Sequence, residues 1–150
     1  MGILKRGLII QPPGAPHSGG LYGKGIYFSD FFAKASTYCR AYLSEGKGLL
    51  ALCQVALGAP AVRNSIDMQV DKAVKDSGGK LNSCEVPGSL KTAPAQSEIV
   101  KQRDGGRLEQ YEVPCGKPLS LKGTGRFYSE QIVYNDNQVK LKYLVMVKLE

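Results

Sequence analysis

In the segment Gly23-Lys24-Gly25-Ile26-Tyr27-Phe28-Ser29-Asp30, a glycine-rich turn leads into three consecutive β-forming residues. Branched and aromatic residues in succession are typical of a short strand, here residues 26–28. Ser29 or Asp30 can cap a helix that follows directly. We predict this helix over about residues 30–43, because apolar side chains recur there at helical spacing: Phe31, Phe32, Ala35, Tyr38, Cys39 and Tyr42.

Strand-like segments lie on both sides of this stretch. Residues 8–10 read as a short strand, and residues 11–25 form a loop rich in proline and glycine. Residues 48–58 are apolar at nearly every position, which favours a central strand covered on both faces of a sheet. Cys39 and Cys53 would then lie in the core.

The second half of the chain also favours strands. Residues 59–110 are polar and too numerous for a plain loop, so we expect small hairpins or strands around residues 81–86 and 99–101. Residues 131–134 and 139–149 are strand-like and are separated by a turn-prone Asn-Asp-Asn sequence. These last strands could form a hairpin or pass to different sheets. The whole predicts an α+β domain, mainly of antiparallel sheet, with one principal helix.

Composition limits the possible classes of protein. With 150 residues, 43% of them hydrophobic and 22% charged, the chain fits one globular domain. No apolar run approaches the roughly 20 residues of a membrane helix, and no secretory signal is evident, so we expect an intracellular protein. The net charge of +7 suits a polyanionic partner such as nucleic acid, ADP-ribose polymer or a dinucleotide, although a merely soluble basic surface explains it equally well.

Metal and nucleotide motifs are not evident. Four scattered cysteines and the single histidine, His17, indicate neither a zinc site nor a disulfide framework, so reduced thiols and no metal are expected. A phosphate-binding P-loop fails at Ser18 and Gly25, and the Rossmann pattern fails because these glycines precede a strand. A dinucleotide, if bound, must be held in another way.

Two separate blocks of sequence resemble the poly(ADP-ribose) polymerases. The first is Gly23-Lys24-Gly25-Ile26-Tyr27-Phe28-x-Asp30 with Lys34 and Tyr38-Cys39. The second combines Val113-Pro114-x-Gly116 with Tyr128-x-Glu130-x-Ile132-Val133-Tyr134 and Gln138-Val139-x-Leu141. The resemblance is strongest over residues 2–58 and 111–149, with only Lys91-Thr92-x-Pro94 between.

The resemblance implies an ADP-ribosyltransferase-like fold and a reaction. NAD would be the substrate, nicotinamide would leave, and ADP-ribose would pass to protein or ADP-ribose acceptors, with no metal involved. A transition state with oxocarbenium character needs a carboxylate, and Glu130 stands at the family's glutamate position. The implied catalytic residues are Glu130, Tyr27 and Lys34. The implied NAD-binding residues are Tyr38, Gly23, Lys24, Gly25, Ala35 and Tyr22, and residues 11–24 correspond to the family's donor loop.

Plain structural interpretations stand beside these roles. A glutamate at a strand start usually faces solvent, Tyr27 and Tyr38 could be core residues, and Lys34 could be a surface lysine. The catalytic interpretation requires Glu130 within about 10 Å of both tyrosines, because more distant groups make no contact. It also requires the carboxylate to be turned away from bulk water.

The sequence departs from the family pattern at several points. The family places a Trp-His-Gly motif on a strand shortly before the segment matched by residues 2–4, so we expect that strand upstream of Met1 and residues 1–150 to be a single, partial catalytic domain. His17 lies in the donor loop and cannot replace that histidine. Ala35 occupies the position of a serine that binds the nicotinamide amide, and Ile9 that of an arginine found in some members. Missing strands would leave sheet edges unpaired and apolar surface exposed.

These departures leave alternatives open. A catalytically impaired fragment that binds NAD, ADP-ribose or a protein shares the same fold, and a basic nucleic-acid-binding domain is suggested by charge alone. For the enzyme, the resemblance implies a nuclear protein, or alternatively a cytoplasmic one, that works in DNA repair without membrane contact. Its partners would be NAD, protein acceptors and, through upstream domains, DNA. Whether it makes polymer or adds single ADP-ribose units is left open, although Glu130 favours polymer.

Overall fold

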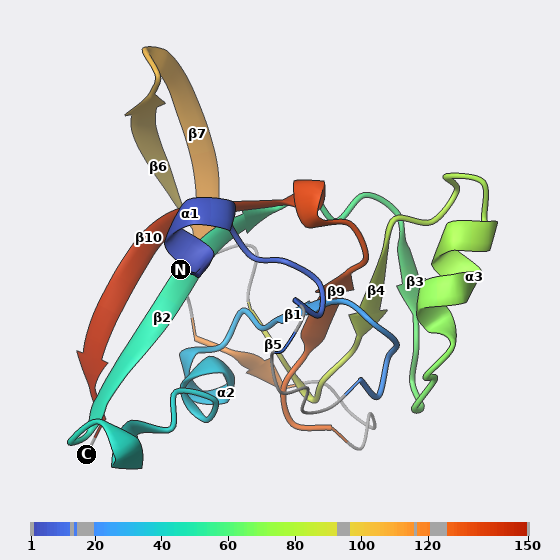
Figure 1. Cartoon of the computed structure of the whole chain (residues 1–150), viewed down its shortest axis with the longest axis horizontal. Coiled ribbons are helices and arrows are strands. Elements are labelled where there is room, and N and C mark those ends of the chain that lie inside the picture. Colours follow the sequence, from blue (N-terminus) through green and yellow to red (C-terminus); the bar gives the residue numbers. More distant parts are fainter. Residues whose placement is uncertain are drawn as a thin grey trace.

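The chain folds into short helices and mostly antiparallel strands (Figure 1), which confirms the predicted α+β class. The computed structural model describes residues 2–12, 14, 20–92, 97–115, 117–120 and 126–149. The helices are α1 (Ile3–Arg6), α2 (Phe32–Ser36) and α3 (Val70–Asp76), with 3-10 helices η1 (Ala41–Leu43) and η2 (Asp136–Gln138). The strands are β1 (Ile26–Phe28), β2 (Lys47–Val55), β3 (Pro60–Val62), β4 (Ser83–Val86), β5 (Leu90–Lys91), β6 (Ser97–Asp104), β7 (Arg107–Pro114), β8 (Leu119–Ser120), β9 (Glu130–Val133) and β10 (Val139–Lys148).

A four-stranded sheet in the order β1-β9-β4-β3 forms the centre of the described structure. β9 pairs antiparallel with β1 on one side and with β4 on the other, while β3 runs parallel to β4. The register places Ile132 opposite Tyr27 and Glu130 opposite Val86. The strands predicted around residues 26–28, 81–86 and 131–134 are therefore confirmed.

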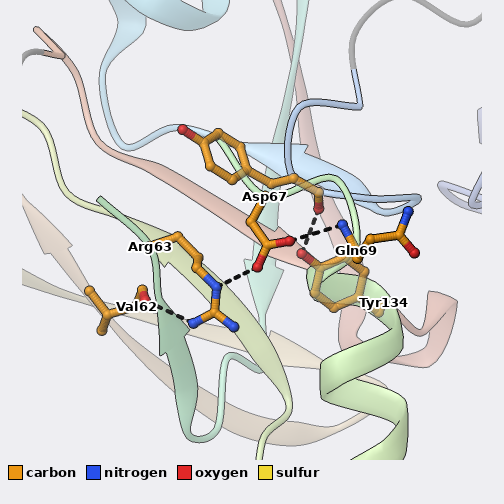
Figure 2. Close-up of polar contacts among 6 residues, drawn as sticks. Val62, Arg63, Asp67, Gln69 and Tyr134 are labelled. Atoms are coloured by element: carbon orange, nitrogen blue, oxygen red, sulfur yellow. Dashed lines mark hydrogen bonds and ion pairs between the residues drawn. The ribbon is translucent and has the colours of Figure 1, made fainter. Parts of the chain in front are cut away.

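The core lies between this sheet and α3, a helix that the sequence did not predict. Its buried members are Tyr22, Ala61, Val70, Val74, Cys84, Val86, Ile132 and Tyr134. Val70 and Val74 stand one helical turn apart and face the sheet together. Just before α3, the Asp67 carboxylate accepts hydrogen bonds from the Arg63 guanidinium at 2.7 Å and from the Gln69 amide at 3.0 Å (Figure 2). This turn directs the helix back across the sheet.

The helix predicted over residues 30–43 is wrong in its length, because α2 spans only Phe32–Ser36. The hydroxyls of Ser36 and Thr37 donate to the carbonyls of Ala33 and Lys34, which offers the backbone an alternative to helical bonding. Arg40 then adopts a left-handed conformation with φ of 47°, and the chain continues as η1. Neither Ser29 nor Asp30 is the N-cap residue, which is Phe31.

The apolar segment over residues 48–58 is not a central strand in this structure, contrary to prediction. Among the described residues β2 pairs only with β10, and its side chains at Leu49 and Leu52 are 62% and 54% exposed. An apolar run indicates that a strand can be buried, but it does not indicate which element packs against it. β9 and β10 pass to different sheets, which settles an alternative that the sequence left open.

Two further predictions are wrong. Residues 8–10 form no strand, because the Ile10 amide donates to the Asp136 side chain at 2.8 Å instead of joining a ladder. Cys39 and Cys53 are only half-buried, and the cysteine in the core is Cys84. The four cysteines, all within the described residues, are not joined by disulfide bonds.

The antiparallel hairpin of β6 and β7 projects away from the central sheet (Figure 1). Glu109 ties this hairpin to β10, because its carboxylate binds the ammonium groups of both Lys140 and Lys142 and accepts a hydrogen bond from the Tyr111 hydroxyl at 2.7 Å. The hydrogen bond from Lys142, then that from Tyr111, lowers the pKa of Glu109 to about 2. The hairpin is therefore held by one carboxylate with several donors.

Replacing Ile132 by alanine should lower the free energy of unfolding by about 2–5 kcal/mol, because this fully buried side chain fills the centre of the core. Urea denaturation would measure the change. The control is Ile99→Ala on the projecting hairpin, where the side chain is 59% exposed and the expected loss is within about 0.5 kcal/mol. Equal losses in both variants would contradict the assigned core.

Acid should release the hairpin through Glu109. Its lowered pKa means that the attachment is complete above the ordinary value of 4.5 and is lost as the pH falls through about 2. The NMR signals of the Tyr111 ring should report this step. Glu109→Gln should remove the step and Glu98→Gln should retain it, whereas an unchanged titration in Glu109→Gln would assign the release to another group.

Candidate active site

Glu130 and Lys34 form an ion pair at the end of the central sheet. Glu130 is the first residue of β9, Lys34 lies on α2, and Nζ stands 2.8 Å from Oε1. The glutamate side chain is 14% exposed, so it does not extend into bulk water. The hydrogen bond to Glu130 raises the pKa of Lys34, while partial burial opposes this rise. A partly exposed pair adds only about 0–1 kcal/mol to stability, so its main effect is to fix the carboxylate in one place.

Tyr38 presents an open aromatic face beside this pair. Its ring is 68% exposed, and the Lys34 ammonium lies 5.6 Å from the ring centroid. The Lys34 ammonium group therefore interacts with both the carboxylate and the aromatic ring. Lys34 and Tyr38 come together although α2 ends between them.

Tyr27 lies next to Glu130 on the same face of the sheet. Ile132 pairs directly with Tyr27, so Glu130, two residues earlier, is the diagonal neighbour of Tyr27 at about 7–8 Å. The Tyr27 hydroxyl accepts a hydrogen bond from the Tyr22 amide at 3.0 Å and donates one to the Gly23 carbonyl at 2.9 Å. Burial is the main cause that raises the pKa of Tyr27. The hydroxyl is thus engaged by the loop, and the ring, 37% exposed, is what Tyr27 can offer to a ligand.

Tyr22 is fully buried beneath the loop. Its carbonyl accepts a hydrogen bond from the Tyr134 hydroxyl at 2.7 Å, and its ring lies 5.0 Å from the Arg126 guanidinium. Tyr22 therefore supports the site from below and presents no surface to a ligand.

The motif glycines have a packing role in addition to any role in binding. Gly23 has φ of 74°, and a Cβ there would lie 2.6 Å from Oδ1 of Asp71 on α3. A Cβ on Gly25 would lie 2.5 Å from the Ile132 side chain. Any side chain at either position would push the loop off the core. Lys24, between them, is exposed.

Ala35 is half-buried on α2 and offers no hydroxyl group. The neighbouring Ser36 does not replace it, because its hydroxyl is turned back to donate to the Ala33 carbonyl at 3.2 Å. Any carboxamide that approaches α2 at this point would find one donor fewer than a serine supplies.

Sequence reasoning missed two serines next to the ion pair. Ser129 precedes Glu130 and is 5% exposed, and the Ser29 hydroxyl donates to the Ser129 carbonyl at 3.1 Å. Ser29 was considered only as a helix cap, and a single hydroxyl between distant segments leaves no periodic signal.

Some predicted features fall elsewhere. His17, Pro94 and residues 13, 15, 16, 18 and 19 of the donor loop lie outside the described residues. An apolar cavity of about 550 Å³ lies between α1 and the β2–β10 pair. A second cavity, of about 430 Å³, lies beside α3, and neither cavity is lined by Glu130 or Lys34.

Within the described part of the chain, no group of three or more His, Cys, Asp or Glu side chains is placed to hold a metal ion. No helix in that part is long and apolar enough to span a bilayer.

The arrangement suits a planar ring and a developing positive charge. A carboxylate shielded from bulk water stabilises cationic character and can polarise a hydroxyl group. The exposed faces of Tyr27 and Tyr38 offer stacking surfaces near that carboxylate.

Comparisons with known proteins all indicate one family. The family model for the poly(ADP-ribose) polymerase (PARP) catalytic domain matches residues 1–149. Poly [ADP-ribose] polymerase 1 of Oryza sativa subsp. japonica is 40% identical over 99% of this chain, and the chain spans 14% of that relative. Poly [ADP-ribose] polymerase 2 of Arabidopsis thaliana is 41% identical over 98% of this chain, which spans 22% of its length. For poly [ADP-ribose] polymerase 1 of Xenopus laevis the identity is 40%, and the chain spans 14% of its length. The chain therefore belongs to the poly(ADP-ribose) polymerase catalytic domain family.

Proposed function

We propose that the chain carries an NAD-dependent ADP-ribosyltransferase site, which releases nicotinamide and transfers ADP-ribose to protein or ADP-ribose acceptors. The observation that supports this most directly is the shielded Glu130 carboxylate, held 2.8 Å from Lys34 beside two exposed tyrosine faces. The family match over residues 1–149 supports NAD as the substrate.

Glu130 acts on the reacting centre in this proposal. Breaking the bond to nicotinamide develops positive charge on the ribose, and a nearby carboxylate stabilises that charge and polarises the acceptor hydroxyl. Lys34 binds Oε1 of the Glu130 carboxylate. The other oxygen, Oε2, is then the one that acts in the reaction. Lys34 thereby orients the carboxylate and contributes a positive charge near the bound ribose.

Aromatic and backbone groups hold the nicotinamide end. The rings of Tyr27 and Tyr38 stack against the nicotinamide, which contributes on the order of 1 kcal/mol beyond burial. The loop of Gly23, Lys24 and Gly25 brings backbone groups close to the dinucleotide. Tyr22 and Ala35 contribute through shape, since one is buried and the other has no polar group.

The same proposal extends to the location of the protein, its acceptors and its product. Residues 1–150 form part of a single catalytic domain, and the protein acts in the nucleus on protein acceptors and in DNA repair, with DNA contacted through other domains. The relatives are poly(ADP-ribose) polymerases by name, which favours polymer as the product. The second candidate is a catalytically impaired module that binds NAD, ADP-ribose or a protein partner without turnover. Ala35 is the observation behind it, because the missing serine hydroxyl removes one hydrogen bond to the carboxamide, worth about 1 kcal/mol.

Glu130→Gln should reduce nicotinamide release by about 10²–10⁴-fold, because the amide cannot stabilise positive charge or accept a proton. The measurement is incubation of the full chain with labelled NAD, followed by quantification of free nicotinamide and labelled protein. Glu45→Gln is the control, since the Glu45 side chain is 89% exposed in its pair with Lys47, and its activity should be unchanged. Equal turnover in Glu130→Gln and the unmodified chain would remove Glu130 from the mechanism. NAD binding without any release would instead support the non-catalytic module.

Glu130→Gln should also lower the pKa of Lys34, because the hydrogen bond to the carboxylate is the largest cause that raises it. The Lys34 contribution to stability is present below the ordinary pKa of 10.5 and is lost as the pH rises through the higher value of the folded chain. NMR titration of the Lys34 ammonium group would measure both. An identical titration curve in the variant would show that the pair does not form in solution.

A further inference from the structure

Ser129, the residue before Glu130, is hydrogen-bonded through its side chain to the segment that follows β4. β4 ends at Val86, which pairs with Glu130, so regular pairing between β4 and β9 stops there. Beyond that point the Ser129 hydroxyl accepts a hydrogen bond from the Gly88 amide at 3.0 Å and donates to the Leu90 carbonyl at 3.3 Å. The Ser129 side chain thus continues the attachment of β9 beyond the last regular pair.

The backbone of Tyr128 and Ser129 lies so close to Gly88 that no side chain fits there. A Cβ on Gly88 would lie 2.3 Å from the carbonyl carbon of Tyr128 and 2.4 Å from the Ser129 nitrogen. The amide of Leu90 donates to the Phe127 carbonyl at 2.9 Å, which extends the contact along the chain. The segment that leads into Glu130 therefore has a rigid support on the β4 side.

A second serine hydroxyl connects the other side of this segment to α2. Ser29 follows β1, and its hydroxyl donates to the Ser129 carbonyl at 3.1 Å and accepts a hydrogen bond from the Phe31 amide at 3.3 Å. Phe31 is the N-cap residue of α2, the helix that carries Lys34. One hydroxyl therefore contacts both the peptide group before Glu130 and the start of the helix that bears its partner.

The aromatic contact between these segments constrains their relative position less than the hydrogen bonds do. The rings of Phe31 and Tyr128 lie 5.2 Å apart with planes tilted by 44°, which attracts the two segments but permits sliding. A hydrogen-bonded hydroxyl fixes distance and angle more narrowly. A misplacement of about 1 Å in a reacting group can cost about 10²-fold in rate, so such narrow control matters at this position.

We propose that Ser29 and Ser129 are positioning residues that set the Glu130 carboxylate against Lys34. Ser129 anchors the approach to Glu130 from the β4 side, and Ser29 fixes α2 relative to it. The effect on catalysis rests on the proposed transferase function, whereas the effect on the geometry of the Lys34–Glu130 pair does not.

The test compares four variants of the full chain. Ser29→Ala removes the connecting hydroxyl, and Ser29→Thr restores it. Ser77→Ala is the matched control, because the Ser77 hydroxyl also donates to a carbonyl, that of Val74, and accepts from an amide, that of Leu81, but lies on the α3 side. Ser29→Cys keeps the size of the side chain with a weaker donor, and serves as a second variant if Ser29→Ala does not fold.

The first readout is the titration of the Lys34 ammonium group by NMR, which needs no turnover. Ser29→Ala should shift this titration toward that of Glu130→Gln, Ser29→Cys should give a smaller shift, and Ser29→Thr and Ser77→Ala should keep the titration of the unmodified chain. Unchanged titration in Ser29→Ala, or an equal shift in Ser77→Ala, would overturn the proposal.

The second readout is the steady-state rate of nicotinamide release. Ser29→Ala should lower kcat by about 10–100-fold with KM for NAD changed by less than about 3-fold, because the hydroxyl aligns a reacting group and does not hold the substrate. If the unmodified chain releases no nicotinamide, the transferase function fails while the Lys34 titration still decides the positioning role. If Glu130→Gln abolishes release and Ser29→Ala matches the unmodified chain in both readouts, the positioning role alone fails.

Discussion

β9 is paired along both of its edges, and this pairing determines where the core and the candidate site lie. Hydrogen bonds to β1 and β4 fix the register of the strand, and the register decides which side chains face the core. Ile132 is thereby buried beneath α3, and Glu130 emerges at the sheet end opposite Val86. Because Glu130 and Ile132 are two residues apart on the same face of β9, a shift of one residue would turn both side chains to the opposite face. The core and the site are in this sense consequences of a single alignment.

Lys34 joins the constraint from outside the sheet. α2 is a short helix with no buried residue, so packing alone positions it weakly. Its attachment depends on directed contacts: the ion pair to Glu130 and the hydroxyl of Ser29. A helix held in this way can be precise at one end without contributing much to the hydrophobic core.

The sequence was informative where a side-chain pattern corresponds to a local structure. The strands around residues 26–28 and 131–134 are predicted by the branched and aromatic residues that cluster there, and the resemblance assigns Glu130, Lys34 and Tyr38 to one site. Length and partners were harder to predict. The apolar stripe over residues 31–42 continues past Ser36, where side-chain hydroxyls compete for the helix carbonyls. The apolar run over residues 48–58 did not reveal that only β10 pairs with β2 in the described structure.

Tyr27 and Gly25 show the limit of assigning roles from motifs. The motif names Tyr27 as catalytic, yet the structure uses its hydroxyl to close the loop at Gly23 and leaves the ring to a ligand. Gly25 is required by its contact with Ile132 whether or not a dinucleotide ever binds. A member of this family that had lost all activity would still need the same residue at this point merely to fold. The glycine signature therefore identifies the fold of a domain, but it does not indicate whether that domain is catalytically active or inactive.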